Sequence, residues 1–311
     1  MSKIIEKIHP WQEPPVVQVS IVNEQQAIHS IVMPIFNQEK NIAKILGFVL
    51  KNTALPFDLI LINDGSTDQS IERVEEFINS DLVRNNSQLS KVTIINNLVP
   101  IYETACDNQG FKLASTKYVL EIQSDIYIEE FGYDQKMIVA LEQFSLGAVS
   151  GRLTHQFSLI DEGRGWLKYP LHLILNRLLL KREGAGRLGA AIFEPMPESE
   201  DICYISETVA RGPIAFRKLD LENLGYLDEA HFFLGNDDHD LCRRIFQSKK
   251  QMVGYIPIQI HSIRDDGSTR QARTGINKKI YEYLKENKTG SPEFKNFLEN
   301  YKPYQPVKKI N

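Results

Sequence analysis

Short apolar runs alternate with longer stretches of helical spacing over the first half of the chain. The runs have the length and composition of strands buried on both faces, and they lie at residues 30–36, 57–63, 91–95 and 118–122. Between them, apolar side chains recur three or four residues apart, as in amphipathic helices, at residues 42–50 and 71–78. This alternation predicts an α/β fold with a mainly parallel sheet flanked by helices.

The alternation is interrupted once and then ends. The stretch from about residue 152 to 207 is rich in glycine and contains one strongly apolar helical segment. Strand and helix signals resume at 213–216 and continue to about residue 263. We therefore predict four parts: a lead-in at 1–27, one domain at 28–265, an insertion within it at about 152–207, and a polar helical tail at 266–311.

Composition and charge exclude several classes of protein. Of the 311 residues, 42% are hydrophobic and 24% are charged. This hydrophobic fraction is too high for a disordered chain. No apolar run reaches the ~18 residues of a membrane span, and the net charge of -4 provides no basic field for nucleic acid. The three cysteines lie too far apart to indicate a disulfide framework or a zinc site. Because the N-terminus lacks the apolar core of a signal peptide, we expect a cytoplasmic protein.

A glycine-rich stretch at residues 184–189 matches the G-x-G-x-x-G pattern of dinucleotide-binding loops. That pattern requires a strand before it and a helix after it, because the pyrophosphate binds at the helix N-terminus. The preceding residues, 171–180, have helical spacing instead. We therefore interpret residues 184–189 as a glycine-rich loop.

Polar and acidic side chains follow the ends of predicted strands or open a helix late in the chain. These segments lie at residues 36–39, 64–68, 123–125 and 235–240. Taken singly, each is also what a turn or a helix N-cap looks like. Because ligands of open α/β sheets bind outside the carboxyl ends of the strands, we expect the segments to converge on one crevice.

Several motifs, in a fixed order, are similar to those of one enzyme family. They lie at residues 30–37, 61–68, 108–114, 212–217, 224–229 and 235–243. On these motifs the chain resembles a family 2 glycosyltransferase of the GT-A fold over about residues 28–265. The resemblance implies a Rossmann-like sheet with a nucleotide half at 28–125, and an acceptor half with a mixed region at 126–265.

The resemblance also implies a pocket for the base of a nucleotide-diphosphate sugar. The expected residues of this pocket are Pro34, Phe36, Glu39 and Asp64. Phe36 offers a face for stacking, and the Asp64 carboxylate can accept a hydrogen bond from a ring N–H of uracil or thymine. We therefore expect a UDP- or dTDP-sugar as donor.

The family's D-x-D motif, which binds ribose and a divalent cation on the diphosphate, reads Gln123-Ser124-Asp125 in this sequence. Gln123 can bind a ribose hydroxyl but brings no charge, whereas Asp125 keeps the metal-binding position. His261 lies where some family members supply a histidine to the metal or diphosphate. The resemblance thus implies a Mn²⁺ or Mg²⁺ site at Asp125 and His261, and a structural role for His261 is the alternative.

The acidic cluster opening a late predicted helix is the expected catalytic element. Asp238 matches the second acid of the family's E-D motif, and Asp237 stands in for the glutamate. Inverting transfer is a single displacement at the anomeric carbon, so the acceptor hydroxyl must lose its proton to a positioned carboxylate. We assign that general base to Asp238, and we interpret His239 as a helix-surface residue.

The acceptor is expected to be a carbohydrate or a glycolipid hydroxyl. Residues 168–182 have one apolar helical face flanked by basic side chains, which predicts either a helix that covers the core or an interfacial helix at a membrane. Trp166 and Tyr169 could stack on an acceptor sugar. Arg270 and Arg273 could clamp a diphosphate, or they could lie on a solvated face.

Two other functions remain open at this point. A catalytically silent relative would bind a nucleotide sugar or glycan without turnover; the change at Gln123 favours it, and the acidic cluster at 237–240 argues against it. A nucleotidyltransferase shares this architecture, but that class has a glycine-rich basic loop after the first strand. Residues 36–40 do not form such a loop.

Overall fold

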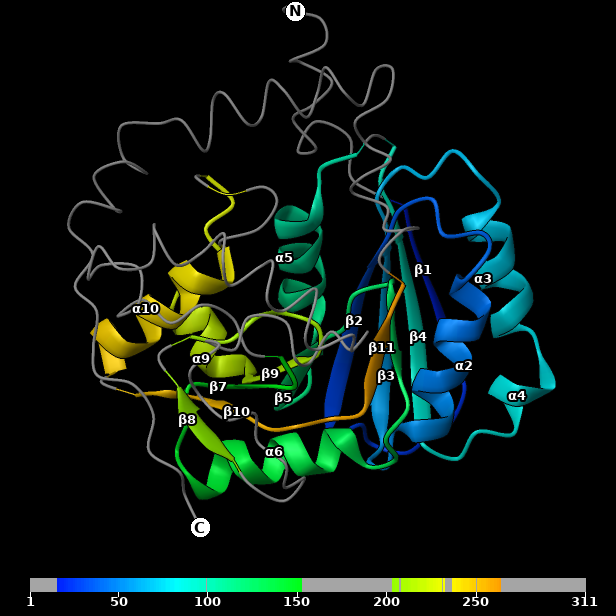
Figure 1. The fold of residues 1–311 in the computed structure, drawn as a ribbon. Coiled ribbons are helices and arrows are strands. Elements are labelled where there is room, and N and C mark those ends of the chain that lie inside the picture. Colours follow the sequence, from blue (N-terminus) through cyan, green and yellow to red (C-terminus); the bar gives the residue numbers. More distant parts are fainter. Residues whose placement is uncertain are drawn as a thin grey trace, which may run out of the picture.

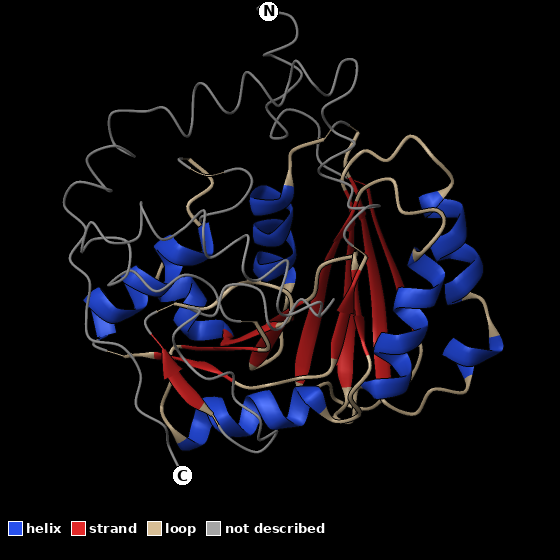
Figure 2. Ribbon diagram, in the orientation of Figure 1, coloured by secondary structure: helices blue, strands red, loops and turns tan. Residues whose placement is uncertain are grey.

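The computed structural model describes residues 16–98, 100–152, 203–206, 208–230, 232, 237–249 and 251–263. Within them, the chain forms a twisted nine-stranded sheet with helices on both faces, and a separate two-stranded ribbon (Figures 1 and 2). The strands of the large sheet are β1 (Val16–Ile21), β2 (His29–Ile35), β3 (Phe57–Asn63), β4 (Leu89–Asn96), β5 (Tyr118–Glu121), β7 (Ala148–Ser150), β8 (Tyr204–Ser206), β9 (Ile214–Arg217) and β10 (Val253–Tyr255).

The sheet has a parallel centre and mixed flanks. Its strand order is β1-β4-β3-β2-β5-β9-β7-β10-β8. The four central strands, β4, β3, β2 and β5, run parallel to one another. Strands β1 and β9 pair antiparallel with their neighbours. Strands β2 and β3 are almost entirely buried, because their apolar runs are covered on both faces. The predicted α/β fold with a mainly parallel sheet is therefore confirmed.

Two apolar cores lie on opposite faces of the sheet. On one face, β2 residues such as Ile31 and Met33 pack with the helices α2 (Ile42–Asn52), α3 (Ser70–Ile78), α4 (Asp81–Arg84) and α6 (Tyr133–Gln143). On the other face, Val32 packs in a core that includes residues of α5 (Glu103–Leu113), α9 (Lys218–Asn223) and α10 (Asp237–Lys249). None of the helices in the described ranges is long and apolar enough to cross a bilayer.

Helix α5 approaches the sheet more closely than a side chain would allow. A Cβ atom on Gly110 would lie 2.3 Å from Cγ1 of Val32, so glycine permits the helix to rest directly on β2. The helix connects β4 to the parallel strand β5, so its N-terminal end lies at the carboxyl edge of the sheet. Glu103 is the first residue of α5 and is therefore held at that edge.

Strand β1 was not predicted, because its residues fall in the expected lead-in. It pairs antiparallel with β4, and Val17, Val19 and Ile21 remain exposed on it. Val17, Val19 and Ile21 alternate with Gln18 and Ser20, so a strand pattern was present within the segment assigned to the lead-in. The second sheet is the ribbon of β6 (Ile126–Ile128) and β11 (Ile260–Ser262).

Several predictions concern residues outside the described ranges and stay predictions. They are the glycine-rich loop at 184–189, the apolar helix at 168–182, Trp166, Tyr169, Arg270, Arg273 and the polar tail at 266–311. The same holds for residues 1–15 of the lead-in and for most of the insertion at 152–207.

Candidate active site

The strand order reverses at β2 and β5, whose carboxyl ends lie at the same edge of the sheet. These strands are parallel neighbours, and the chain continues from β2 to β3 on one side while β5 lies on the other. Such a reversal of strand order is where open α/β sheets bind ligands. The loops after β2, β3 and β5 meet there with the N-terminal end of α5, as predicted for the segments at 36–39, 64–68 and 123–125.

The loops after β2 and β3 are tied to each other by polar contacts. The amide of Asn37 donates to Oγ of Ser66 at 3.1 Å, and the Asn37 side-chain oxygen accepts from the amide of Thr67 at 2.8 Å. Glu39 accepts from the amide of Gln69 at 3.1 Å, so this predicted base-pocket residue also braces a loop. Pro34 is partly exposed, whereas the ring of Phe36 is only 7% exposed.

Asp64 anchors the start of α5. Its Oδ1 and Oδ2 accept hydrogen bonds from the amides of Ile101 and Tyr102, at 2.6 and 3.0 Å. These bonds hold Tyr102 at a φ of 70°, a left-handed conformation that costs a non-glycine residue energy. Burial raises the pKa of Asp64 to about 7, while the two amides and Cys106 lower it. Both carboxylate oxygens thus already have partners within the protein, and a nucleotide base would share them.

Gln123 lies between two charged side chains. Its Nε2 donates to Oε1 of Glu103 at 2.6 Å, and its Oε1 accepts from the guanidinium of Arg152 at 2.9 Å. The amide is therefore fixed in one orientation. Ser124, the next residue, is buried.

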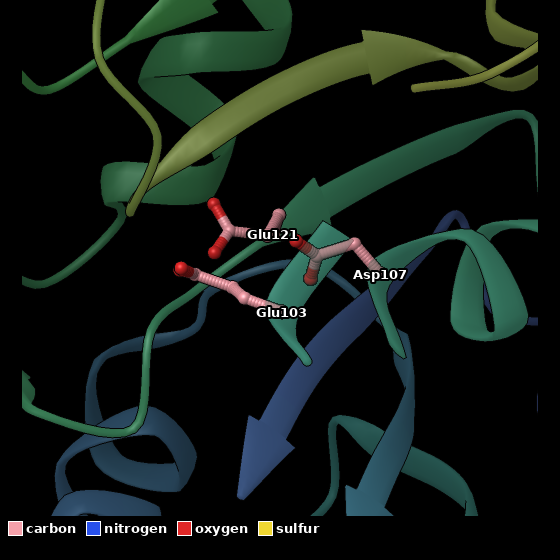
Figure 3. A group of neighbouring side chains, drawn as sticks. All are labelled: Glu103, Asp107 and Glu121. Carbon is pink, nitrogen blue, oxygen red and sulfur yellow. The ribbon is translucent and has the colours of Figure 1, made fainter. Parts of the chain in front are cut away.

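A buried arginine gathers carboxylates from three elements. The guanidinium of Arg211 forms ion pairs with Glu103 at 3.3 Å, with Asp107, and with Asp237 at 3.2 Å. Glu121 on β5 accepts from the amide of Gly212, directly after the arginine, at 2.8 Å. Figure 3 shows the carboxyl groups of Glu103 and Asp107, from α5, turned toward that of Glu121. This cluster links α5, β5 and the first turn of α10.

Glu103, Asp107 and Glu121 are also close enough to hold a metal ion, since their ligand atoms lie within 4.8 Å of one another. Two of the three already contact the Arg211 guanidinium, which supplies a positive charge at this place. Burial raises the pKa of Asp107, against the charge of Arg211, and it raises the pKa of Glu121 to about 8.

Helix α10 begins at Asp237, as the acidic cluster predicts, and its first turn enters the same site. Asp237 is fully buried and accepts from the hydroxyl of Thr104 on α5 at 2.7 Å. Asp238 accepts from the amide of His239 at 2.9 Å, and its Oδ1 lies 3.1 Å from the His239 Nδ1. Burial raises the pKa of Asp238, but His239 and then Arg211 lower it by a larger amount. The pKa of this carboxyl group is therefore below its usual value. His239 is therefore a partner of Asp238 as well as a partly exposed helix residue.

Asp125 and His261 both lie at the two-stranded ribbon. In its register His261 pairs with Tyr127, and the amide of Ile263 donates to the carbonyl of Asp125 at 2.8 Å. The His261 ring stacks on that of Tyr127, with centroids 6.1 Å apart. Carboxylate oxygens are ligands that Mn²⁺ and Mg²⁺ prefer, and imidazole suits these ions less, so the metal-binding role of this pair stays a prediction.

The three cysteines are buried. Burial raises the pKa of Cys203 and of Cys242 to about 12, and it raises the pKa of Cys106 well above its usual value. A nucleophilic thiol needs the opposite shift. Cys106 lies next to Asp64, but it is fully buried and is not placed as a nucleophile.

The family of the chain follows from comparison with known sequences. The sequence profile described as "Glycosyl transferase family 2" matches residues 30–186, about half of the chain. The chain belongs to glycosyl transferase family 2. The motif resemblance drawn from the sequence is confirmed, and the parallel centre of this family 2 protein lies within the matched part.

Curated relatives match this family 2 protein over part of their length. Glycosyltransferase GlyG of Streptococcus pneumoniae serotype 4 is 28% identical over 101 residues, which are 32% of this chain and 31% of GlyG. The uncharacterized glycosyltransferase EpsJ of Bacillus subtilis is 27% identical over 154 residues, covering 50% of this chain and 40% of EpsJ. The family 2 protein thus spans less than half of each of these relatives.

Solved structures share the fold. The mannosyltransferase PcManGT from Pyrobaculum calidifontis, in complex with GDP-Man and Mn²⁺, has a TM-score of 0.51 at 13% identity. The match covers 96% of this family 2 protein and 75% of that chain. At such an identity the likeness concerns the fold, and it confirms the predicted GT-A architecture.

The sequence analysis missed part of the site of this family 2 protein. Glu103, Asp107, Glu121, Arg152 and Arg211 were not singled out. Glu121 sits within an apolar run, where a charged residue is rarely buried without a partner, and that was the one available signal. Arg211 lies 104 positions from Asp107 in the sequence, so no spacing rule connects them.

Proposed function

We propose that this protein transfers a sugar from a nucleotide-diphosphate donor to a hydroxyl group, with inversion at the anomeric carbon. The observation that carries this proposal is the convergence of two parts of the chain. Thr104 and Arg211 bind Asp237, so the first turn of α10 meets the carboxyl edge at which Asp64 and Gln123 lie. A base at the start of α10 would then face a donor bound at the strand ends.

Asp238 is the proposed general base. Its carboxylate is ionised at neutral pH, and its side chain is 14% exposed at the first turn of α10, so an acceptor hydroxyl can reach it. Asp237 differs, since it is fully buried and bound to Thr104 and Arg211. We therefore assign Asp237 to orienting the helix and Asp238 to the proton.

The proposed donor lies along the carboxyl edge, with its base near Pro34, Phe36, Glu39 and Asp64. Asp125 and His261 would hold a Mn²⁺ or Mg²⁺ ion, which neutralises the charge of the leaving diphosphate when it is bound. Gln123 and Ser124, in the loop after β5, are proposed to contact the part of the donor between its base and the metal ion. A UDP- or dTDP-sugar is the proposed donor, and a carbohydrate or glycolipid hydroxyl is the proposed acceptor. We also propose a cytoplasmic location, with membrane contact through residues 168–182.

One observation favours a second function, binding of a nucleotide sugar without turnover. Gln123 replaces an acid of the family motif, and both ends of its amide are bound by protein groups. A protein of this kind would bind the donor and release no nucleotide diphosphate. Turnover of a nucleotide sugar therefore separates the two functions.

A thermal-shift panel tests the proposal. UDP, dTDP and GDP are added with and without Mn²⁺, and the melting temperature is recorded. A ligand at about 100 times its Kd stabilises a protein by about 2.7 kcal/mol, which for a chain of this size is a shift of about 4 °C. We expect a shift with UDP or dTDP that grows with Mn²⁺. Indifference to every nucleotide would contradict the proposal, and binding without release of UDP from UDP-sugars would favour the second function.

A further inference from the structure

Thr104 carries a buried hydroxyl that joins two distant parts of the chain. It is the second residue of α5 and is fully buried. Its Oγ1 donates to Oδ2 of Asp237 at 2.7 Å, although the two residues are 133 positions apart in the sequence. This single bond therefore connects the first turn of α5, which rests on the sheet, with the first turn of α10.

The Asp237 carboxylate is held at both of its oxygens. Oδ1 pairs with the Arg211 guanidinium at 3.2 Å and accepts from the backbone amide of Asp238 at 3.0 Å. Oδ2 accepts from Thr104. A carboxylate that is bound at one oxygen can still rotate about that contact, whereas bonds at both oxygens fix its plane. The Thr104 hydroxyl thus completes the orientation of Asp237.

The backbone of Asp238 depends on that orientation. Its amide donates directly to the Asp237 carboxylate. The Asp238 side chain accepts in turn from the amide of His239 at 2.9 Å, and its Oδ1 lies 3.1 Å from the His239 Nδ1. A change in the position of Asp237 would therefore move the backbone and the side chains of this turn together.

The turn that carries Thr104 is itself held from the nucleotide side of the sheet. Asp64 accepts from the amides of Ile101 and Tyr102, at 2.6 and 3.0 Å, just before α5 begins. Thr104 follows Tyr102 by two residues. The hydroxyl is therefore presented to α10 from a fixed support.

We propose that Thr104 is a positioning residue, whose hydroxyl sets the place of Asp238 by way of Asp237. This role rests on the proposed function, because it presupposes that Asp238 is the general base. It adds to the reaction a fully buried residue that acts only through another. Misplacement of a catalytic group by ~1 Å can cost about 100-fold in rate. Loss of the hydroxyl should therefore slow turnover and leave donor binding nearly unchanged.

Thr104→Val tests this role, because it removes the hydroxyl and keeps the shape of the side chain. Turnover is measured as release of the nucleotide diphosphate from a panel of UDP-, dTDP- and GDP-sugars, with water as the acceptor. We expect kcat for the best donor to fall about 10-fold or more, and the Kd of its nucleotide diphosphate with Mn²⁺, from calorimetry, to stay within about 3-fold of wild type. Thr104→Ser keeps the hydroxyl and should restore kcat to within about 3-fold.

Thr53→Val is the matched control. Thr53 is also a buried threonine whose hydroxyl is bonded, to the carbonyl of Val49 at 2.7 Å. It lies at the C-terminal end of α2, on the opposite face of the sheet from α5. This variant should lose stability and keep the wild-type kcat.

The ring NMR signal of His239 reports the position of the turn without any turnover. The signal is assigned by its loss in His239→Gln. We expect it to shift in Thr104→Val and to keep its wild-type position in Thr104→Ser and in Thr53→Val.

Asp237→Asn is a second variant, which changes the other partner of the same bond. It should also lower kcat and keep the nucleotide Kd, so the test stands even where Thr104→Val is poorly folded. A wild-type kcat in folded Thr104→Val or Asp237→Asn, an unmoved His239 signal in Thr104→Val, or an equal loss of kcat in Thr104→Ser would overturn this role and leave the proposed function intact. Absence of turnover by the wild-type protein with every donor would overturn both.

Discussion

The acidic residues at the carboxyl edge of the sheet differ sharply in what their surroundings do to them. Burial raises the pKa of Asp64 to about 7, whereas His239 and Arg211 bring the pKa of Asp238 below its usual value despite burial. Asp64 accepts from the amides of Ile101 and Tyr102, which offset part of the effect of burial, whereas Asp238 stays ionised at neutral pH. Residue type alone does not distinguish these roles.

Asp238→Asn tests the assignment of the base. The amide keeps the size of the side chain and cannot accept a proton, so we expect UDP binding within about 3-fold of wild type and a loss of transfer of about 100-fold or more. Donor binding is measured by calorimetry, and transfer is measured as release of UDP in the presence of an acceptor.

Asp240→Asn is the matched control, because Asp240 lies in the same turn and pairs with Arg244 at 2.6 Å. It should lower stability and leave the transfer rate of the folded protein within a few-fold. Full transfer activity in Asp238→Asn would remove Asp238 from its proposed role.

Which residues of the site could be predicted depends on where they lie in the chain. Asp64 and Gln123 directly follow strands, and parallel strands deliver such residues to one edge, so the sequence places them together. Glu103 and Arg211 meet through the packing of α5 against the loop before β9, which no local pattern encodes. Their partnership is visible only once the tertiary structure is known.

At the scale of elements, α5 is the part that assembles the site. Asp64 fixes its first turn, and Gly110 lets its middle rest on β2. Asn108 bonds both the amide and the carbonyl of Leu227, at 3.0 and 2.9 Å, which ties the helix to the loop after α9. A displacement of α5 would therefore move Glu103 and also disturb the acceptor side.

Gly110→Ala should displace this helix. The added Cβ would lie 2.3 Å from Val32 Cγ1, and overpacking of this kind costs about 1–3 kcal/mol. We expect the free energy of unfolding, from urea titration, to fall by that amount. UDP binding of the folded fraction should weaken too, because Asp64 of the proposed base pocket is bound to the start of this helix.

Gly47→Ala is the matched control on α2. Nothing lies within 4 Å of its added Cβ, and alanine favours a helix over glycine by roughly 1 kcal/mol, so this variant should be slightly more stable than wild type. Equal destabilisation by the two substitutions would show that close packing of α5 on β2 is not the cause.

The sequence predicted the long apolar strands and missed β1 at the edge of the sheet. Strands β2 and β3 are continuous apolar runs, and their predicted and observed ranges differ by no more than a residue at either end. In β1, Val17, Val19 and Ile21 are exposed and alternate with polar residues, a strand pattern that the assignment of residues 1–27 to a lead-in overlooked.

For the molecule as a whole, one buried imidazole connects stability to pH. His29 is fully buried, stacks on Phe57 with centroids 5.9 Å apart, and lies 3.7 Å from Asp134 Oδ2. Burial lowers the pKa of His29 to about 3. Between this value and the ordinary value near 6.5, the unfolded chain binds a proton that the folded protein does not, so stability falls as the pH decreases through that window.

His29→Phe should remove this contribution, since phenylalanine is apolar and can still stack on Phe57. From pH 7 to pH 5, we expect the wild-type protein to lose on the order of 2 kcal/mol more stability than the variant, at about 1.4 kcal/mol per unit. Urea unfolding at the two pH values measures the difference. Parallel pH dependence in both proteins would mean that His29 is protonated in the folded state.

The buried thiols have a practical consequence. Cys106 lies in the first turn of α5, Cys242 lies in α10, and Cys203 lies against Gly254 on β10. An alkylating reagent can reach a buried thiol only when the surrounding structure opens, so the labelling rate of each cysteine reports the opening of its own region. The unmodified chain therefore carries three reporters of local opening, and comparison of their rates with and without a ligand would show which part of the molecule that ligand closes.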